Sequence, residues 1–395
     1  MPEIPHIRAA ALFAALLLLT GCGKPVPQEA SLPPAPEAAS SASPKTPASE
    51  PVSEPAPEPE PAPLPAGQEV LLFGARTPTR ADGDTLYVDA EALAGAAGLH
   101  AFFDASRITL TQTTSESFPV ARADELDAGE GFLQEGAAYV PLLEAAARFG
   151  FVTGTAIDGT PYLAKTAAHS APTENVNVPV LMYHAVSDDV WGYRDLFVSP
   201  QTMEEELLYL QENGYETIWF SDLSHLEDYE KPVILTFDDG YDDNYTELFP
   251  LLQKYNAKAT IFVIPKYIGA EHKMTAAQVQ ELARSGLVSI QSHTYSHGNL
   301  STMDEETLIY EMQESQNYLA ALTGHVPYVV CYPEGTRSEL SIEVAGRYYD
   351  YGLLMNGQLY NTSDDPMRVK RFYIPRSYDL GSFKWSIEQA GTSRK

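Results

Sequence analysis

The sequence has few basic residues, few cysteines and no apolar run long enough to span a membrane. It carries 25 Lys and Arg against 54 Asp and Glu over 395 residues, for a formal net charge of −29. A protein that binds the phosphate backbone of nucleic acid needs a basic face to displace counterions, so that class of partner is excluded. Two cysteines allow at most one disulfide, which excludes a cysteine-stapled scaffold. The apolar fraction of 44% still lets most of the chain bury a core.

A short apolar run near the N-terminus ends close to a cysteine. It spans Ala9 to Leu19, which is too short for a helix across a hydrocarbon core of about 30 Å and is typical of a signal peptide. The Leu-Thr-Gly-Cys sequence that ends at Cys22 resembles a bacterial lipobox, which implies lipidation of that thiol. We therefore expect a lipoprotein signal peptide over 1–23 and a mature protein anchored at the extracellular face of the bacterial cytoplasmic membrane. The alternative is an ordinary signal peptide in which the cysteine has no role.

Prolines concentrate in the next segment. Residues 24–66 hold 14 of the 30 prolines, interleaved with Ala, Glu and Ser and without any aromatic residue. Such a segment cannot bury enough apolar surface to offset the entropy of ordering it, so a Pro-rich disordered linker is predicted there. At about 3.1 Å per residue where extended, this linker could carry a domain on the order of 100 Å from a membrane surface.

An internal repeat follows the linker at a spacing of 52 residues. The segment 87–94 matches 139–146, and Gly98 matches Gly150. Each half predicts a strand, an Ala-rich helix that ends near its glycine, and a second strand, at 108–110 or 162–163. We predict a small α+β domain over 67–170. The duplicated half and its Tyr-Val-Pro-Leu start resemble the copper amine oxidase N-terminal-like stalk domain of secreted bacterial proteins, which implies a spacer or wall-contact role.

Apolar, β-branched runs alternate with helical segments from residue 171 onward. Near-continuous apolar strands separated by helices imply a parallel sheet covered by helices. With seven or eight such units, a distorted (β/α) barrel of about seven strands is favoured over an open sheet. We predict an α/β catalytic domain over 171–395, with reactive side chains just after the strands. The predicted strands are 180–183, 216–220, 233–237, 260–264, 288–290, 328–330, 351–355 and 372–374.

Polar side chains follow four of these strands, where a barrel carries its reactive groups. Asp238-Asp239-Gly240 follows one strand and is, by itself, typical of a turn. His293 and His297 are four residues apart, so they share one face of a helical turn and can bind one cation with a carboxylate from a neighbouring strand. Three protein ligands leave a position open for water, which is typical of a catalytic metal site.

These motifs resemble those of a known family. The segments 236–240 (Thr-Phe-Asp-Asp-Gly) and 293–297 (His-Thr-Tyr-Ser-His) are similar to the first two motifs of the polysaccharide deacetylases, the family of the NodB-homology domain and carbohydrate esterase family four. The segments 179–184 and 332–335 resemble a subgroup whose Met-Tyr-His motif precedes the Asp-Asp pair. The likeness covers more than half of the chain.

The resemblance implies a role for each polar residue. Asp239, His293 and His297 would hold one divalent metal, usually zinc, Asp238 would be the general base, and His184, across the site, would be the general acid. These residue types fit the chemistry, since hydrolysis of an amide needs a Lewis acid on the carbonyl, an activated water and a proton donor.

The third motif departs from the family's pattern. A backbone N–H in the turn of Tyr332, Pro333, Glu334 and Gly335 would stabilise the oxyanion. The family commonly has an Arg two residues before the proline and an aromatic residue after it, whereas Cys331 and Glu334 stand there in this chain. We expect Cys331 to be an inert buried residue, and Glu334 puts an anion where an aromatic ring would line the sugar groove.

The missing arginine must come from elsewhere in the chain. Arg371 and Arg376, in the last predicted strand, are the candidates for orienting the base carboxylate, and the alternative is that both are ordinary charges at a strand end. Four aromatic residues could stack on sugar rings or simply pack in the barrel rim: Trp191, Tyr193, Tyr241 and Tyr295.

The sequence therefore predicts a membrane-anchored, monomeric hydrolase that removes N-acetyl groups from a polysaccharide containing N-acetylglucosamine. Peptidoglycan or an exopolysaccharide is the expected substrate, because an anchored enzyme on a spacer reaches the wall around it. Two alternatives remain. One is an esterase that takes O-acetyl groups from xylan or another glycan, and the other is a non-catalytic polysaccharide-binding lipoprotein built on a decayed barrel.

Overall fold

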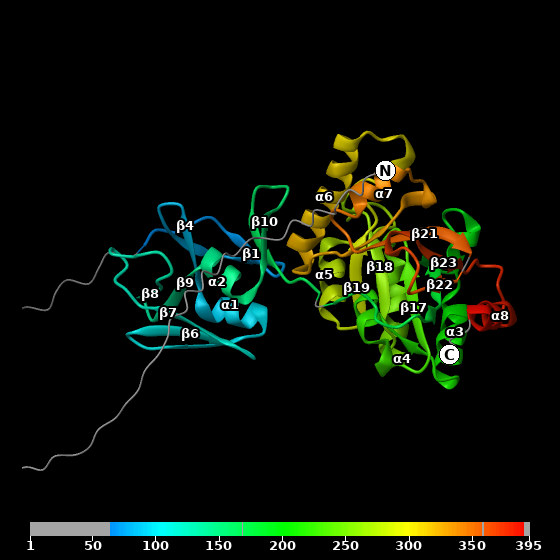
Figure 1. Cartoon of the computed structure of the whole chain (residues 1–395), viewed down its shortest axis with the longest axis horizontal. Coiled ribbons are helices and arrows are strands. Elements are labelled where there is room, and N and C mark those ends of the chain that lie inside the picture. The colour runs from blue at the N-terminus through cyan, green and yellow to red at the C-terminus, as the bar shows by residue number, and fades with distance from the viewer. Residues whose placement is uncertain (1–63, 168, 358, 391–395) are drawn as a thin grey trace, which may run out of the picture. The chain divides into compact units, whose positions relative to one another are not determined.

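A computed structural model describes residues 64–167, 169–357 and 359–390 of the chain (Figure 1). The predicted signal peptide with Cys22 and all but the last three residues of the predicted linker lie outside these residues. No helix in the described ranges is long and apolar enough to cross a membrane. The lipid anchor and the linker therefore stay predictions.

Residues 64–164 contain three small sheets and two helices. The sheets have the strand orders β10-β11-β1-β2, β3-β4-β9-β8 and β5-β6-β7. Their bounds are β1 (Val70–Leu72), β2 (Ala75–Thr77), β3 (Thr79–Asp82), β4 (Thr85–Asp89), β5 (His100–Phe103), β6 (Arg107–Thr111), β7 (Ser115–Pro119), β8 (Phe132–Gln134), β9 (Ala137–Pro141), β10 (Val152–Thr155) and β11 (Pro161–Ala164), with helices α1 (Ala90–Ala97) and α2 (Leu142–Phe149).

The internal repeat has a direct structural counterpart. The repeated strands β4 and β9 pair with each other in antiparallel fashion, with Val88 opposite Val140. Each is followed by an eight-residue helix that ends at its glycine, where Gly98 and Gly150 take φ values of 72° and 67°. The likeness to a stalk domain, the domain boundary and the proposed spacer role stay predictions.

The region after residue 176 contains a closed barrel of parallel strands. The ring runs β13-β23-β21-β20-β19-β18-β17 and closes through pairing of β17 with β13, while β16 adds to the edge of β17. This confirms the predicted barrel of seven strands. The strands are β12 (Asn177–Val178), β13 (Val180–Tyr183), β14 (Ala185–Val186), β15 (Phe197–Val198), β16 (Glu216–Thr217), β17 (Pro232–Phe237), β18 (Ala259–Val263), β19 (Val288–Ser292), β20 (Val329–Cys331), β21 (Tyr351–Gly357), β22 (Tyr360–Asn361) and β23 (Val369–Tyr373).

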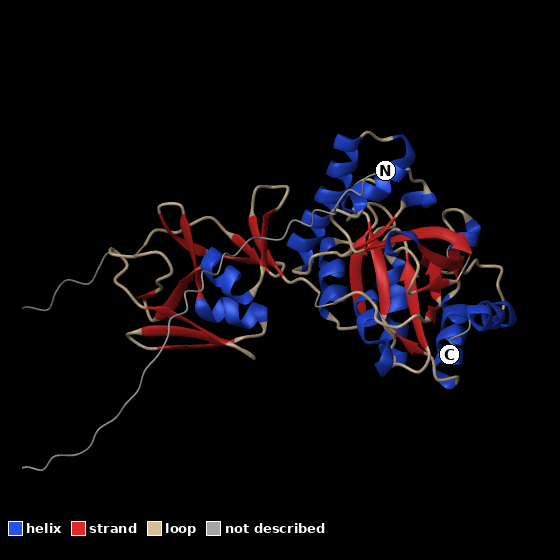
Figure 2. Ribbon diagram, viewed as in Figure 1, coloured by secondary structure: helices blue, strands red, loops and turns tan. Residues whose placement is uncertain are grey.

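Helices cover the outside of the barrel (Figure 2). Burial on both faces explains why β17 is mostly apolar: Val233 and Leu235 pack in a cluster with helix residues, whereas Ile234 packs in a second cluster with barrel strands. A strand buried on both faces has no solvent side on which to place polar residues. The helices are α3 (Pro200–Glu212), α4 (Phe249–Tyr255), α5 (Ala276–Arg284), α6 (Glu305–Thr323), α7 (Glu339–Ala345) and α8 (Leu380–Ala390).

One predicted strand is shorter than expected. The run 216–220 forms a strand only over Glu216–Thr217, and a 3₁₀ segment begins at Phe220. Ile218 and Phe220 are both buried in the cluster of barrel residues. Their apolar character therefore reflects packing against the barrel interior and not a continued strand, a distinction that a short apolar run cannot make.

A carboxylic acid is buried between α3 and the barrel. Glu206 is 0% exposed, and its Oε2 accepts a hydrogen bond of 2.8 Å from the Tyr183 hydroxyl. Its Oε1 has no hydrogen-bond partner in the described part of the chain. Burial raises the pKa of Glu206 to about 8, so the group is protonated in the folded protein at neutral pH.

This burial predicts a specific pH dependence of stability. At pH values between the unfolded pKa of about 4.3 and the folded pKa, the folded state binds one more proton at Glu206 than the unfolded state does. The free energy of unfolding therefore falls as pH rises through this range. The loss is at most about 1.4 kcal/mol per pH unit. Glu206→Gln should therefore melt higher than the parent at pH 8, and the difference should shrink towards pH 5. Glu205→Gln, on the exposed side of α3, controls for the lost charge, and a constant difference for Glu206→Gln would contradict the assignment.

Candidate active site

The polar residues that follow four barrel strands meet at one end of the barrel. Because β13, β17, β19 and β20 belong to one parallel sheet, their carboxyl ends lie at the same edge. His184 follows β13, Asp238 and Asp239 follow β17, and His293 follows β19. The tertiary structure thus brings together residues that the sequence places more than a hundred positions apart.

Three of these side chains form a candidate metal-binding group. The Oδ1 atom of Asp239 lies 3.5 Å from Nε2 of His293 and 3.5 Å from Nε2 of His297. The ligand atoms of all three lie within 4.8 Å of one another. Nδ1 of His293 is 2.9 Å from the Cys331 carbonyl oxygen, which can only accept, so Nδ1 carries the proton and Nε2 keeps its lone pair. Burial lowers the pKa of His293 to about 4, which favours the same neutral form.

A tight turn aims the Asp239 carboxylate at the two imidazoles. Asp239 and Gly240 take positive φ values of 74° and 63°, a conformation that is uncommon for a residue with a side chain. Nζ of Lys273 donates a hydrogen bond of 2.9 Å to the Asp239 carbonyl oxygen, and the Met274 N–H donates one of 3.1 Å to that of Gly240. The segment after residue 268 therefore holds this unusual backbone in place.

Asp238 forms a buried bidentate ion pair with Arg371. Both side chains are almost fully buried, and Nη1 and Nη2 of Arg371 each donate a hydrogen bond of 2.7 Å to one carboxylate oxygen. Nε of Arg371 donates to the Leu354 carbonyl oxygen. Burial alone would raise the pKa of Asp238, but the charge and hydrogen bonds of Arg371 hold it well below its usual range. Arg376 does not reach Asp238, and instead bonds the carbonyl oxygens of Ser187 and Phe197.

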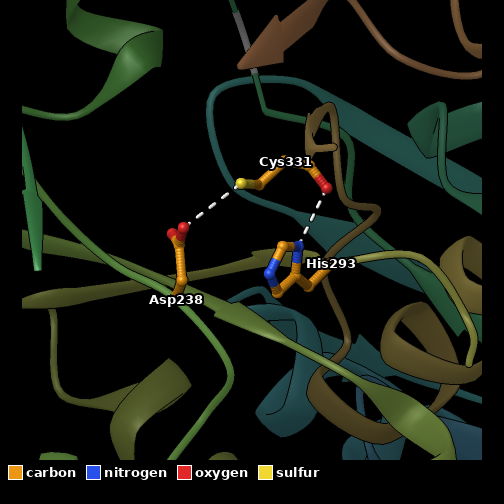
Figure 3. A group of neighbouring side chains, drawn as sticks. All are labelled: Asp238, His293 and Cys331. Atoms are coloured by element: carbon orange, nitrogen blue, oxygen red, sulfur yellow. Dashed lines mark hydrogen bonds between the residues drawn. The ribbon is translucent and has the colours of Figure 1, made fainter. Parts of the chain in front are cut away.

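Cys331 forms hydrogen bonds with both Asp238 and His293 (Figure 3). Its Sγ lies 3.4 Å from Oδ2 of Asp238 and 3.1 Å from Nη2 of Arg371, while its carbonyl oxygen accepts from His293. Burial raises the pKa of the thiol well above its usual value, so it stays protonated and donates to the carboxylate. The residue is buried as expected, and its thiol also contacts the ion pair. Sequence patterns did not reveal these contacts because they depend on Arg371, which comes from another strand.

His184 lies beside Asp238 and not across the site from it. The Nε2 atom of His184 is 3.9 Å from Oδ2 of Asp238. The Asn244 side-chain amide donates to the His184 carbonyl oxygen, which fixes the backbone. Nδ1 of His184 has no hydrogen-bond partner among the described residues. Burial lowers the pKa of His184, and the charges of Asp238 and Asp239 oppose that shift.

The turn after β20 has one free backbone donor. The Tyr332 N–H donates to the Leu353 carbonyl oxygen, the Gly335 N–H donates to that of Tyr332, and Pro333 has no N–H. The Glu334 N–H has no hydrogen-bond partner within the described ranges. Glu334 also takes a positive φ of 52°, which turns its peptide out of the regular turn geometry.

The four aromatic candidates differ in how much ring surface they leave free. Trp191 stacks on His272 at 4.1 Å and packs edge-on against Tyr241. Tyr295 packs edge-on against Tyr310, which lies on α6. Tyr193 is 69% exposed and is the most exposed of these four side chains.

Comparison with known proteins agrees with this geometry. Residues 225–349 match the family model described as polysaccharide deacetylase. The segments 236–240, 293–297 and 332–335 lie within this match, whereas 179–184 lies outside it. Residues 225–349 belong to the polysaccharide deacetylase family. This matched segment contains Asp238, Asp239, His293 and His297, whereas His184 and Arg371 lie outside it.

Curated relatives and solved structures extend the deacetylase match. The chain is 34% identical over 185 residues to a Bacillus subtilis protein named "Putative polysaccharide deacetylase YxkH", covering 46% of this chain and 64% of that protein. It is 25% identical over 255 residues to the poly-β-1,6-N-acetyl-D-glucosamine N-deacetylase of Escherichia coli K12, covering 52% and 38%. The chain thus spans less than two thirds of either relative.

A solved structure has the same fold as the deacetylase domain. The Streptococcus pyogenes deacetylase PplD, solved in complex with acetate, superposes with a TM-score of 0.51 at 24% sequence identity. The superposition covers 54% of this chain and 99% of that one.

The ion pair predicts unequal effects of two arginine substitutions. Arg371→Met leaves the buried Asp238 carboxylate without a counter-charge, which should lower the free energy of unfolding by about 3–5 kcal/mol. Arg376→Met removes two hydrogen bonds to backbone carbonyls and a 3.5 Å contact with the exposed Asp188 carboxylate, and it should cost about 1–2 kcal/mol. Denaturant unfolding of the two variants measures this. Equal losses would show that the buried pair does not carry the stability expected of it.

Proposed function

We propose that the chain is a metal-dependent hydrolase that removes N-acetyl groups from a polysaccharide containing N-acetylglucosamine at the bacterial cell surface. The observation that carries the proposal is the joint placement of two sets of groups. Asp239, His293 and His297 form a group that could hold a metal ion, and the side chains of Asp238 and His184 lie next to each other at the same end of the barrel. The names of the B. subtilis and E. coli relatives, which both contain the word deacetylase, support the same reaction.

The three-ligand group fits a zinc ion. Two imidazole nitrogens and one carboxylate oxygen are donors that zinc accepts in catalytic sites with an open fourth position. When bound, such an ion would polarise the acetyl carbonyl and lower the pKa of a water molecule. The hydrogen bond from His293 to Cys331 directs Nε2 towards Asp239, as an orienting partner of a metal-ligating histidine does.

Asp238 is placed to take the proton of the attacking water. Arg371 keeps this carboxylate ionised, and each oxygen that accepts from the guanidinium retains a lone pair for a further hydrogen bond. Removing the proton as the new C–O bond forms avoids building positive charge on the oxygen.

His184 is placed to return a proton to the departing nitrogen. An amine leaves the tetrahedral intermediate only when protonated, and Nε2 of His184 lies beside the carboxylate that gained the proton. The free Glu334 N–H would stabilise the negative oxygen of that intermediate, since a donor held in place before the reaction needs no reorganisation.

The setting at the cell surface follows from the N-terminal segments. A lipid at Cys22 and an extended linker would hold the barrel near the membrane while it reaches polymers of the wall. We propose peptidoglycan or an exopolysaccharide as the substrate and a monomer as the active form. The E. coli relative's name, an N-deacetylase of poly-N-acetylglucosamine, favours an amide over an ester substrate.

The reaction and its metal dependence can be tested together. The protein should release acetate from N-acetylglucosamine oligomers or peptidoglycan faster than from acetylated xylan. A chelator should abolish this release, and added zinc should restore it. Full activity in chelator would overturn the metal mechanism, and turnover confined to the xylan ester would overturn the amide substrate.

Separate roles for base and ligand predict different losses. Asp238→Asn keeps the ligand set, so it should retain roughly one equivalent of metal while activity falls by about 10²-fold or more. His293→Ala removes a ligand and should lose both metal and activity. Metal analysis and acetate release on the same samples separate the two outcomes. An Asp238→Asn variant with parental activity would exclude Asp238 as the base.

A further inference from the structure

A buried carboxylate outside the ligand set holds the loop that carries both histidines. Glu311, on α6, is only 4% exposed, and both of its carboxylate oxygens bond the segment 293–297, called here the histidine loop. Its Oε2 accepts a hydrogen bond of 2.8 Å from the Ser296 N–H, and its Oε1 accepts the Ser296 hydroxyl. Its own carbonyl oxygen accepts the Tyr295 N–H. No basic side chain in the described ranges pairs with Glu311, so the loop alone satisfies its buried carboxyl oxygens.

The histidine loop needs such support because its backbone is unusual. Thr294 and His297 take positive φ values of 61° and 59°, a region in which residues with side chains are strained. The Thr294 hydroxyl accepts the His297 N–H at 3.2 Å, which is the loop's own internal bond. Strained backbone of this kind persists when surrounding structure fixes it, and the two bonds from Ser296 to Glu311 are the strongest candidates for that role because they tie the loop to a buried side chain of α6.

The two histidines depend on the loop to different degrees. The His293 ring is held directly by its hydrogen bond to the Cys331 carbonyl oxygen. The His297 ring makes no hydrogen bond to the described residues besides its 3.5 Å contact with Asp239. The position of His297 therefore follows from its backbone, and the residue directly before it is the one that Glu311 binds.

We propose that Glu311 is a positioning residue for the metal site: its carboxylate fixes Ser296 so that His297 completes the ligand set with Asp239 and His293. The inference rests on the proposed metal site but not on the proposed substrate. A chain without this carboxylate would still fold and would still hold all three ligands, but it would have to order the loop at the moment of metal binding. The cost would appear as a weaker affinity for the ion.

The test is a zinc titration of the full chain against a competing chelator. Glu311→Gln keeps the size of the side chain but loses the charge, so it should weaken zinc binding by about 10–100-fold. Ser296→Ala removes only the hydroxyl bond and should weaken binding by a smaller factor. In the double variant the two losses should not multiply, because both substitutions weaken the same Ser296–Glu311 contact. Glu306→Gln, an exposed position on α6, should bind zinc like the parent.

A second readout separates positioning from a general loss of structure. With zinc in excess, the Ser296→Ala and Glu311→Gln variants should recover most of the parental turnover number, which a misfolded protein would not do. Variants that bind zinc as tightly as the parent would overturn the inference alone. A parent that binds no zinc would overturn the metal site and this inference together. Bound zinc without acetate release from any polymer would overturn the proposed function and leave the role of Glu311 standing.

Discussion

The buried pair of Asp238 and Arg371 is the interaction on which the rest of the site depends. Two opposite charges away from water are tolerated only when each satisfies the other in good geometry. Arg371 lies on β23, which pairs with β13, and β13 pairs with β17, which carries Asp238. The pair therefore bridges the two strands that flank β13, at the pairing that closes the ring.

Strained backbone and buried charge occur together around this pair. Asp239 and His297, two residues of the candidate metal group, both take positive φ. Each is supported by a side chain outside that group: Lys273 bonds the carbonyl oxygen of Asp239, and Glu311 bonds the residue before His297. The barrel thus provides rigid strands, while the loops after them hold the geometry that a metal site requires.

Much of this could be predicted from the sequence, and the exceptions have physical reasons. Seven of the eight apolar runs form strands of the closed ring because strands buried on both faces must be apolar. The strand predicted over 216–220 was wrong beyond its second residue, since an apolar run can also pack against the barrel interior without forming a strand. Glu311 was missed, although a Glu among the buried residues of an amphipathic helix is a signal that could have found it.

The sequence by itself determined the alternation of strands and helices, the order of the polar motifs and the chemistry their residue types can perform. These are local properties, set by periodicity and by side-chain donors. Only the tertiary structure decided that Arg371 and not Arg376 meets Asp238, that His184 lies beside that carboxylate, and that Cys331 contacts both. Such contacts depend on strand order and closure of the barrel, which no short segment of the chain encodes.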